Sequence, residues 1–335
     1  MARTNPPKKI KIVFFGTPEF VIPIPEILLK SGFQLVACIT APDKPVGRKQ
    51  ILSPSPVKKW AKERKIKVID SPKIAEIEKE VKNIGAEVGI LAAYGKIIPK
   101  TLIEIFPKGI LVIHPSLLPK YRGSSPVQAA IALGEEETGV SVFKMDEEID
   151  HGPLIWQTKE KISPEDTALS LYQRLFKIAA KNLPKILEYY IFGCDRPKIC
   201  NIGGGKFYSP PKPQNHQKAS YTPLLRKKDG FIPGETLGFI APKPGFTSKC
   251  KIGPYDLEPT PENLERFIRA MTPWPGTWTT FPLRPSGQLK RLKILKAHLE
   301  NKKLVPNLVQ IESKKPVSFK EFKKAYLDEK FNLNF

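Results

Sequence analysis

The chain has 335 residues, which is long enough for two domains with a core each. Of these residues 41% are hydrophobic, a share that excludes a disordered or membrane-embedded class. Its 55 basic and 33 acidic residues give a formal net charge of +22, and residues 201–335 alone carry 24 basic and 11 acidic residues. Such a surface favours a polyanionic partner through counterion release, although a generally lysine-rich composition would look similar.

Short apolar runs alternate with amphipathic stretches from the N-terminus to about residue 190. In chain order we predict strand 10–15, helix 24–30, strand 33–40, a polar loop at 41–49, helix 57–64, strand 67–69, helix 74–83, strand 87–93, helix 101–106, strand 109–114, helix 126–133, strands 140–144 and 154–159, and helix 166–189. Strands that alternate with helices predict an α/β domain built on a parallel sheet.

The alternation stops in a stretch rich in Gly, Pro and Lys. We therefore predict a first domain at residues 1–204, a linker at 205–222 and a second domain at 223–335. Beyond the linker, a helix at 261–270 and strands at 277–281, 292–298 and 308–311 are expected. Short strands separated by turns predict a small β-rich domain, such as an OB-like barrel.

The four cysteines and the N-terminal segment indicate the compartment. No cysteine pair has CxxC spacing and no histidine lies at ligand spacing from them, so we expect reduced thiols and no metal. Residues 1–9 are polar and basic, and prolines and Glu19 interrupt the apolar run that follows. We expect neither a signal peptide nor a membrane span, and a cytoplasmic protein.

Candidate chemistry gathers between residues 109 and 153. His114 lies at the carboxyl end of a predicted strand, where open α/β sheets bind ligands, and Asp150 follows the next predicted strand. A carboxylate beside an imidazole orients the ring and suits it to proton transfer near neutral pH. Each residue alone also fits a structural role, His114 as a satisfied loop histidine and Asp150 as a turn residue. The loop at Gly16 lacks the further glycines of a nucleotide fingerprint.

Several motifs around these residues resemble the folate-dependent formyltransferases, and within them the branch that formylates aminoacylated initiator tRNA. The motifs are His114-Pro-Ser-Leu-Leu-Pro-Lys-Tyr-Arg-Gly123, Glu137-Thr-Gly-Val140, Asp150-His-Gly152, Phe15-Gly-Thr-Pro-Glu-Phe20, Pro42-Asp-Lys-Pro-Val-Gly-Arg48, Ser53-Pro-Ser-Pro-Val-Lys58, Ala92-Ala-Tyr-Gly95, Ile268-Arg-Ala270 and Trp274-Pro-Gly276. The resemblance runs along nearly the whole chain in order and is weaker at residues 233–259.

The resemblance implies a Rossmann-like domain that binds 10-formyltetrahydrofolate as cosubstrate, without a metal, and a C-terminal barrel that helps to hold tRNA. It implies that His114 donates toward the oxygen that becomes negative and that Asp150 holds the ring and helps to accept a proton. The family carries an Asn two residues before the His, where this chain has Val112. Loss of one such donor costs about 10²–10³ in rate, unless a backbone N–H or a side chain such as Ser116 compensates.

The resemblance also supplies binding residues. For folate these are Ala92, Tyr94, Gly95, Ser116, Leu117, Leu118, Pro119 and Asp146, and for tRNA they are Lys44, Arg48, Lys49, Arg122 and Arg269. We expect folate and aminoacylated initiator tRNA as partners, no membrane, and a monomer. Two alternatives stay open, namely a formyltransferase acting on a sugar-nucleotide amine and a catalytically impaired RNA-binding relative.

Overall fold

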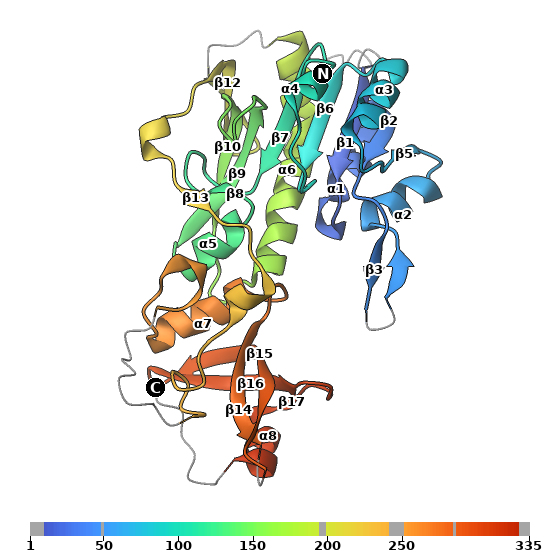
Figure 1. Ribbon diagram of the computed structural model, residues 1–335. Helices are drawn as coiled ribbons and strands as arrows, with labels where there is room; N and C mark the ends of the chain where they lie inside the picture. Colours follow the sequence, from blue (N-terminus) through green and yellow to red (C-terminus); the bar gives the residue numbers. More distant parts are fainter. Residues whose placement is uncertain (1–9, 48–49, 194–198, 241–250, 284–285, 328–335) are drawn as a thin grey trace. The chain divides into compact units, whose positions relative to one another are not determined.

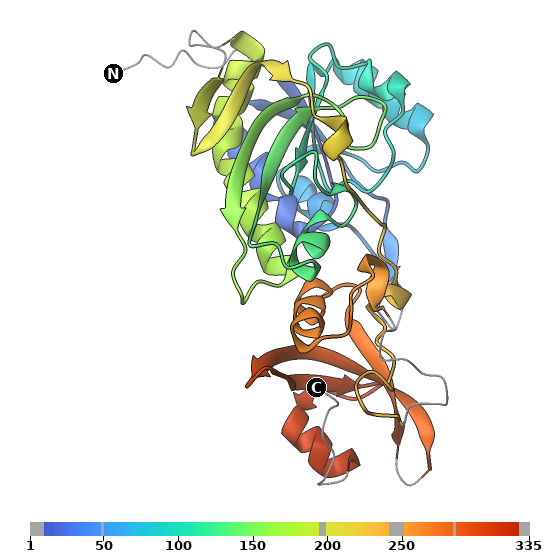
Figure 2. The ribbon, with the colours of Figure 1, turned by 90° about the vertical axis from the view of Figure 1, so that its left-hand side faces the viewer.

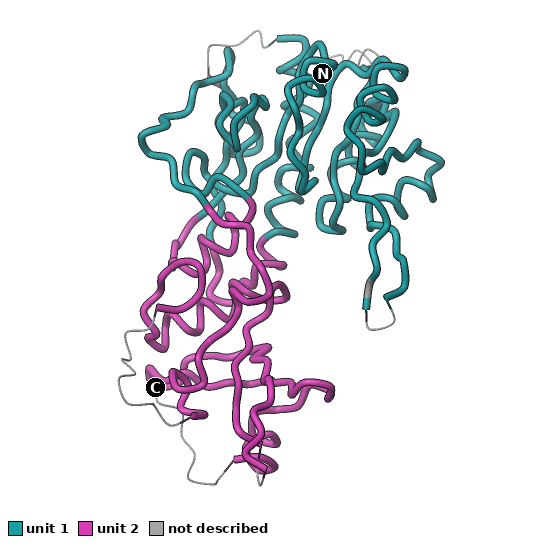
Figure 3. Tube along the Cα trace, in the orientation of Figure 1, with its two compact units in different colours: residues 1–123, 138–161, 172–221 teal, residues 124–137, 162–171, 222–335 magenta. Residues whose placement is uncertain are grey.

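The computed structural model describes residues 10–47, 50–193, 199–240, 251–283 and 286–327. The chain divides into two compact units, shown in Figure 3. Unit 1 comprises residues 1–123, 138–161 and 172–221, and unit 2 comprises residues 124–137, 162–171 and 222–335. Two short segments of the N-terminal half therefore belong to unit 2. No helix among the described residues is long and apolar enough to cross a membrane.

Unit 1 is built on a nine-stranded sheet with the order β11-β12-β10-β9-β7-β6-β1-β2-β5 (Figure 1). Its strands are β1 (Lys11–Gly16), β2 (Gln34–Ile39), β5 (Lys67–Ile69), β6 (Val88–Ala92), β7 (Ile110–His114), β9 (Glu137–Lys144), β10 (Leu154–Lys161), β11 (Ile199–Ile202) and β12 (Gly205–Lys212). Its helices are α1 (Pro23–Lys30), α2 (Pro56–Glu63), α3 (Ile74–Ile84), α4 (Lys100–Ile103) and most of α6 (Ala168–Phe192). The predicted alternation of strands and helices is confirmed.

The sheet is mixed: the predicted parallel arrangement is confirmed for five neighbouring strands, and antiparallel pairs extend the sheet beyond them. Strands β5, β2, β1, β6 and β7 run parallel, whereas β9 pairs antiparallel with β7, and β12 pairs antiparallel with both β10 and β11. The chain reaches β9 through the two-residue strand β8 (Arg122–Gly123) and the short helix α5 (Pro126–Ala132), and β9 then runs antiparallel to β7. The loop after β9 therefore starts near the amino end of β7, where Met145 N donates to Ile110 O at 2.8 Å.

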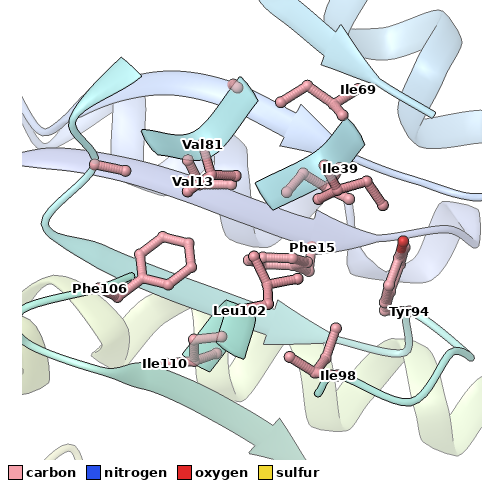
Figure 4. Packing of buried hydrophobic residues seen from close by; sticks show 13 residues of the cluster. Val13, Phe15, Ile39, Ile69, Val81, Tyr94, Ile98, Leu102, Phe106 and Ile110 are labelled. Carbon is pink, nitrogen blue, oxygen red and sulfur yellow. The ribbon is translucent and has the colours of Figure 1, made fainter. Parts of the chain in front are cut away.

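The core on one face of this sheet is a cluster of aliphatic and aromatic side chains (Figure 4). Phe15 on β1 lies edge-on to Tyr94 and Phe106, with ring centroids 5.7 and 5.9 Å apart. Helices α3 and α4 cover this face with Val81 and Leu102, among others. Helix α6 runs along the other face (Figure 2), where its Tyr172 and Phe176 stack on Phe20. Both faces of the parallel strands are thus covered, which explains their continuous apolar runs.

The segment predicted as a polar loop at 41–49 contains part of a hairpin, formed by β3 (Lys44–Val46) and β4 (Ile51–Ser53) and seen in Figure 1. Lys58 Nζ lies 2.6 Å from the carboxylates of both Asp43 and Asp70, which ties the base of the hairpin to the end of β5. These two hydrogen-bonded carboxylates raise the pKa of Lys58. The two strands were not predicted because they form a separate two-stranded sheet. Such a hairpin does not need the apolar run that marks a buried strand.

Residues 205–212, part of the segment predicted as the linker, form strand β12 between β10 and β11. The Gly and Pro content that suggested a linker is tolerated here because the register with β10 shifts between Leu154 and Trp156, which leaves room for Pro210 and Pro211. Trp156 Nε1 donates to Ile202 O at 3.0 Å across this part of the sheet. Strands β11 and β12 were not predicted.

Unit 2 contains a four-stranded antiparallel sheet with the order β14-β15-β16-β17. Its strands are β14 (Thr277–Leu283), β15 (Gln288–Glu300), β16 (Lys303–Ile311) and β17 (Val317–Ser318), and its helices include α5 (Pro126–Ala132), α7 (Pro261–Ala270) and α8 (Phe319–Tyr326). An α/β domain followed by a small β-rich domain is therefore confirmed, and closure of this second sheet into a barrel stays a prediction. Helix α5 packs against α7, which explains why residues 124–137 belong to unit 2.

Candidate active site

The candidate site begins at His114, the last residue of β7. This side chain is 5% exposed, and its Nε2 lies 2.9 Å from the backbone oxygen of Tyr121. Because a carbonyl oxygen can only accept, Nε2 carries the proton and donates it. The bond fixes the plane of the ring and leaves Nδ1 as its second position for chemistry.

The turn between His114 and Gly123 is held by side chains from β9 and β10. Ser141 Oγ donates to Ser116 O at 2.7 Å and accepts from Leu118 N at 3.1 Å. Gln157 Nε2 donates to Leu118 O and to Ser141 Oγ, at 3.0 and 2.8 Å. A Cβ at Gly139 would lie 2.1 Å from Thr158 O and would also meet the Leu117 side chain, so only glycine fits there. The turn is therefore rigid before any ligand binds.

Asp150 reaches His114 through the loop that connects β9 to β10. Because β9 is antiparallel to β7, residues 145–153 double back along the sheet, and Asp150 sits at a φ of +49°. A Cβ at Gly152 would lie 1.9 Å from Lys144 O, so the return of this loop requires glycine. Asp150 Oδ2 accepts from Gly123 N at 2.7 Å and faces His114 Nδ1 at 3.5 Å. The structure therefore brings together the two residues predicted to carry the chemistry.

Val112 occupies the same face of β7 as His114, since side chains alternate along a strand. The pairing of β7 with β6 and β9 shows no shift of register, so no bulge turns Val112 away. Its side chain is 4% exposed and packs with Leu118, Phe143 and Leu154, among others. Hydrocarbon therefore lines the site where the resemblance leads us to expect an amide.

The Ser116 hydroxyl does not fill the gap left by that amide. Ser116 is fully buried, and its Oγ donates its only proton to Lys120 O at 2.7 Å. The hydroxyl is thus engaged in closing the turn and has no second proton for a ligand oxygen.

The residues predicted to bind folate flank two strand ends. Ala92 ends β6, Tyr94 is 3% exposed, and Gly95 has a φ of +80° with nothing within 4 Å of where a Cβ would stand. Burial raises the pKa of the Tyr94 hydroxyl to about 12, so it is neutral at physiological pH. Leu117, Leu118 and Pro119 lie in the rigid turn described above.

Asp146, the last of the predicted folate residues, borders a cavity of about 550 Å³. The cavity is lined by Lys100, Ile103, Glu104, Asp146, Glu147 and Glu148. Lys100 Nζ lies 2.8 Å from Glu147 Oε1, and this hydrogen bond raises the pKa of the lysine. Carboxylates therefore outnumber cations in the cavity, which suits a ligand rich in N–H donors.

A network of polar side chains contacts the Asp150 loop, and the sequence did not predict it. Arg122 is 1% exposed, and its guanidinium donates to Gln214 Oε1 at 2.8 Å and to Tyr221 OH at 3.2 Å. Arg122 Nη2 also lies 2.8 Å from His216 Nδ1, and the His216 ring stacks on His151 with centroids 3.9 Å apart. Arg122 is thus buried within this network, and its contact with tRNA stays a prediction. Only the folded chain reveals the network, because its partners lie about 90 residues apart in sequence.

The other residues predicted to contact tRNA are distributed over both units. Lys44 is exposed on the β3–β4 hairpin, while Arg48 and Lys49 lie outside the described residues. Arg269 on α7 is bound to Glu265 at 2.6 Å and donates to Asp166 O at 2.9 Å, within unit 2. Across the described ranges, no group of three or more His, Cys, Asp or Glu side chains could hold a metal ion.

Two family models match this chain. Residues 8–187 match the model described as formyl transferase, and residues 256–307 match the formyl transferase C-terminal domain. Among curated proteins, the methionyl-tRNA formyltransferase of Desulforamulus reducens is 36% identical over 81% of this chain and 74% of its own. That of Marinobacter nauticus is 35% identical over 81% of this chain and 76% of its own.

Solved structures share the fold. The methionyl-tRNA formyltransferase from Clostridium thermocellum superposes with a TM-score of 0.55 at 19% identity, over 91% of this chain and all of that one. A sugar N-formyltransferase from a Shewanella species gives a TM-score of 0.53 at 16% identity, over 84% of this chain and 96% of its own. At these identities the likeness concerns the fold alone.

Proposed function

Because this chain belongs to the methionyl-tRNA formyltransferase family, we propose that it transfers a formyl group from 10-formyltetrahydrofolate to the α-amino group of methionyl-tRNA, in the cytoplasm. The observation that carries the proposal is the meeting of His114 Nδ1 and Asp150 Oδ2 at the end of β7, from two motifs 36 residues apart. This pair supplies the proton handling that formyl transfer needs.

Formyl transfer makes a bond from the acceptor amine to the formyl carbon and breaks the bond from that carbon to the donor nitrogen. The carbonyl oxygen becomes negative on the way, the amine loses a proton and the donor nitrogen gains one. His114 donates Nε2–H to Tyr121 O, so Nδ1 is the ring position that acts. Its separation of 3.5 Å from Asp150 is longer than a hydrogen bond, which leaves Nδ1 capacity for a substrate oxygen.

Asp150 has two tasks in this proposal. Its carboxylate orients the His114 ring, which donates from Nδ1 to the developing oxyanion when both ring nitrogens carry a proton, and it accepts the amine proton directly or through water. Gly123 N–H keeps Oδ2 in place at 2.7 Å while this happens. Val112 supplies no donor, so the oxyanion is stabilised by His114 with one polar partner fewer than the resemblance implies.

The residues present fit a reduced folate as the formyl donor, which supplies the carbon that is transferred. A pterin ring presents N–H and amino donors, and the carboxylates of Asp146, Glu147 and Glu148 accept from such groups. The rigid turn at Leu117–Pro119 and the strand end at Ala92 would border the rest of the donor. These assignments are our proposal for the predicted folate residues.

The acceptor proposal draws on charge and on one exposed hairpin. A net charge of +22 favours a polyanion, and the β3–β4 hairpin presents Lys44 together with the solvent-exposed Ile51 and Leu52. We propose that this hairpin and the basic C-terminal third hold methionyl-tRNA, and that the chain acts as a monomer. We keep the proposed division into a catalytic domain at 1–204, a linker at 205–222 and a tRNA-binding domain at 223–335, except that residues 205–212 belong to the sheet of unit 1 as strand β12.

The test is formation of formylmethionyl-tRNA by the purified full chain from 10-formyltetrahydrofolate and charged initiator tRNA. We expect product, competition by uncharged tRNA, and tRNA binding that weakens steeply with salt. Formylation of a sugar-nucleotide amine in place of methionyl-tRNA would overturn the choice of acceptor. Binding of folate and tRNA without any product would identify an impaired relative and overturn the proposed activity.

A further inference from the structure

Gln214 lies behind the Asp150 loop and is 6% exposed. Its Nε2 donates to two backbone oxygens of that loop, Asp150 O at 3.0 Å and Gly152 O at 2.8 Å. Its Oε1 accepts from Arg122 Nη2 at 2.8 Å. Two carbonyls need donors and one guanidinium needs an acceptor, so the amide satisfies all three only in this orientation.

The three hydrogen bonds of Gln214 all help to place the Asp150 carboxylate. Asp150 stands in the left-handed region, which a non-glycine residue occupies at a cost unless its surroundings hold it there. Gln214 bonds the carbonyls of Asp150 and of the residue two positions later, and so bridges the turn at this strained residue. Through Arg122 the same amide connects the loop to the end of the turn that begins at His114.

The segment around Gln214 is itself fixed to that turn. Ser220 O accepts from Arg122 N at 2.8 Å, and Ser220 Oγ accepts from Tyr121 N at 2.9 Å. Tyr121 is also the residue whose carbonyl orients His114. One short stretch, residues 214–221, therefore contacts both the loop of Asp150 and the turn that fixes His114.

We propose that Gln214 is a positioning residue for the proposed formyl transfer: it sets the distance between Asp150 and His114 by holding the Asp150 loop against Arg122. The inference rests on the proposed function, and it concerns a side chain that touches no substrate. A displacement of a catalytic group by about 1 Å can cost about 100-fold in rate, so the expected effect falls on turnover.

The test compares Gln214→Glu with wild type and with Gln217→Glu, a matched change at an exposed glutamine of the same segment. Glu at 214 keeps the size and still accepts from Arg122, but it cannot donate to the two carbonyls. We expect kcat to fall at least 10-fold, the KM values for tRNA and folate to stay within about threefold, and Gln217→Glu to match wild type. Faster amide exchange confined to residues 150–152 should accompany the fall in kcat.

Gln214→Ala provides a second variant if the carboxylate prevents folding, and a thermal unfolding curve of each variant checks this. A wild-type kcat in a folded Gln214→Glu chain overturns the inference, as does a rise in KM with kcat unchanged. Product formation by wild type separates the two claims: without it the proposed function fails, and with it only the role of Gln214 is at stake.

Discussion

The two sides of the candidate site, both built on β7, differ in how they are made. On one side, His114, Asp150 and the turn between Tyr121 and Gly123 are joined by hydrogen bonds to fixed backbone atoms. On the other side, two residues earlier on the same face, Val112 packs into hydrocarbon. The polar side is preorganised for proton transfer, whereas the apolar side supplies shape alone.

This difference separates two contributions to catalysis that are usually found together, namely polar groups that stabilise charge and apolar groups that shape the site. Preorganised donors aimed at a developing charge are often the largest single contribution to catalysis, and a site with fewer of them depends more on those that remain. Of the two side chains considered as donors, His114 remains, because Ser116 is committed to Lys120 O. In the proposed mechanism, one imidazole therefore carries most of the electrostatic stabilisation.

The largest effect on the rate of formylation is expected from substitutions of His114 and Asp150 on the polar side. His114→Ala and Asp150→Asn should each slow formylation of methionyl-tRNA by about 10³-fold or more, because each removes a partner in proton transfer and oxyanion stabilisation. Single-turnover formation of formylmethionyl-tRNA measures the loss. Retention of a tenth of the wild-type rate in either variant would show that another group performs the chemistry.

Arg48, which is outside the described residues, serves as a reference for binding. By resemblance it contacts the acceptor end of tRNA, so Arg48→Ala should lower kcat/KM for tRNA about 10- to 100-fold and leave the folate KM unchanged. The salt dependence of tRNA binding should flatten by about one unit for a lost phosphate contact. Equal losses in folate and tRNA affinity would place Arg48 in the active site instead, and contradict its assignment to the acceptor.

The residues of the polar side were largely predictable from sequence, whereas the residues that hold them in place by hydrogen bonds were not. His114 and Asp150 stand out because each follows a strand within a recognisable motif, and the structure confirms that they meet. The direction of β9 was not predictable, since an apolar run does not tell whether a strand runs parallel or antiparallel to its neighbour. Gln214 and Ser141 carry no local signal, because single polar residues become informative only through the backbone atoms that they reach.

An amide at position 112 should show how much a second donor would add to the site. Val112→Asn points toward the same site as His114, so we expect kcat to rise about 10-fold if its N–H group reaches the developing oxyanion. Placing an amide among Leu118, Phe143 and Leu154 should also lower the free energy of unfolding by about 1–3 kcal/mol. Val112→Leu is the matched control, and it should leave kcat unimproved. An unchanged or lower kcat in Val112→Asn would show that another group already fills the role.

The smallest effect is expected from Ser116, the side chain that was the natural candidate to replace the missing amide. Its hydroxyl proton is bound to Lys120 O at 2.7 Å in a fully buried setting, so Ser116→Ala should remove one buried hydrogen bond, worth about 1 kcal/mol of stability. Turnover should change by less than about threefold, because Gln157 and Ser141 still hold the turn. If turnover instead drops by about 30-fold or more while the melting temperature is unaltered, the hydroxyl leaves Lys120 during the reaction and donates to the oxyanion. The apolar side would then contain a concealed donor, and the contrast between the two sides would exist only before substrate binds.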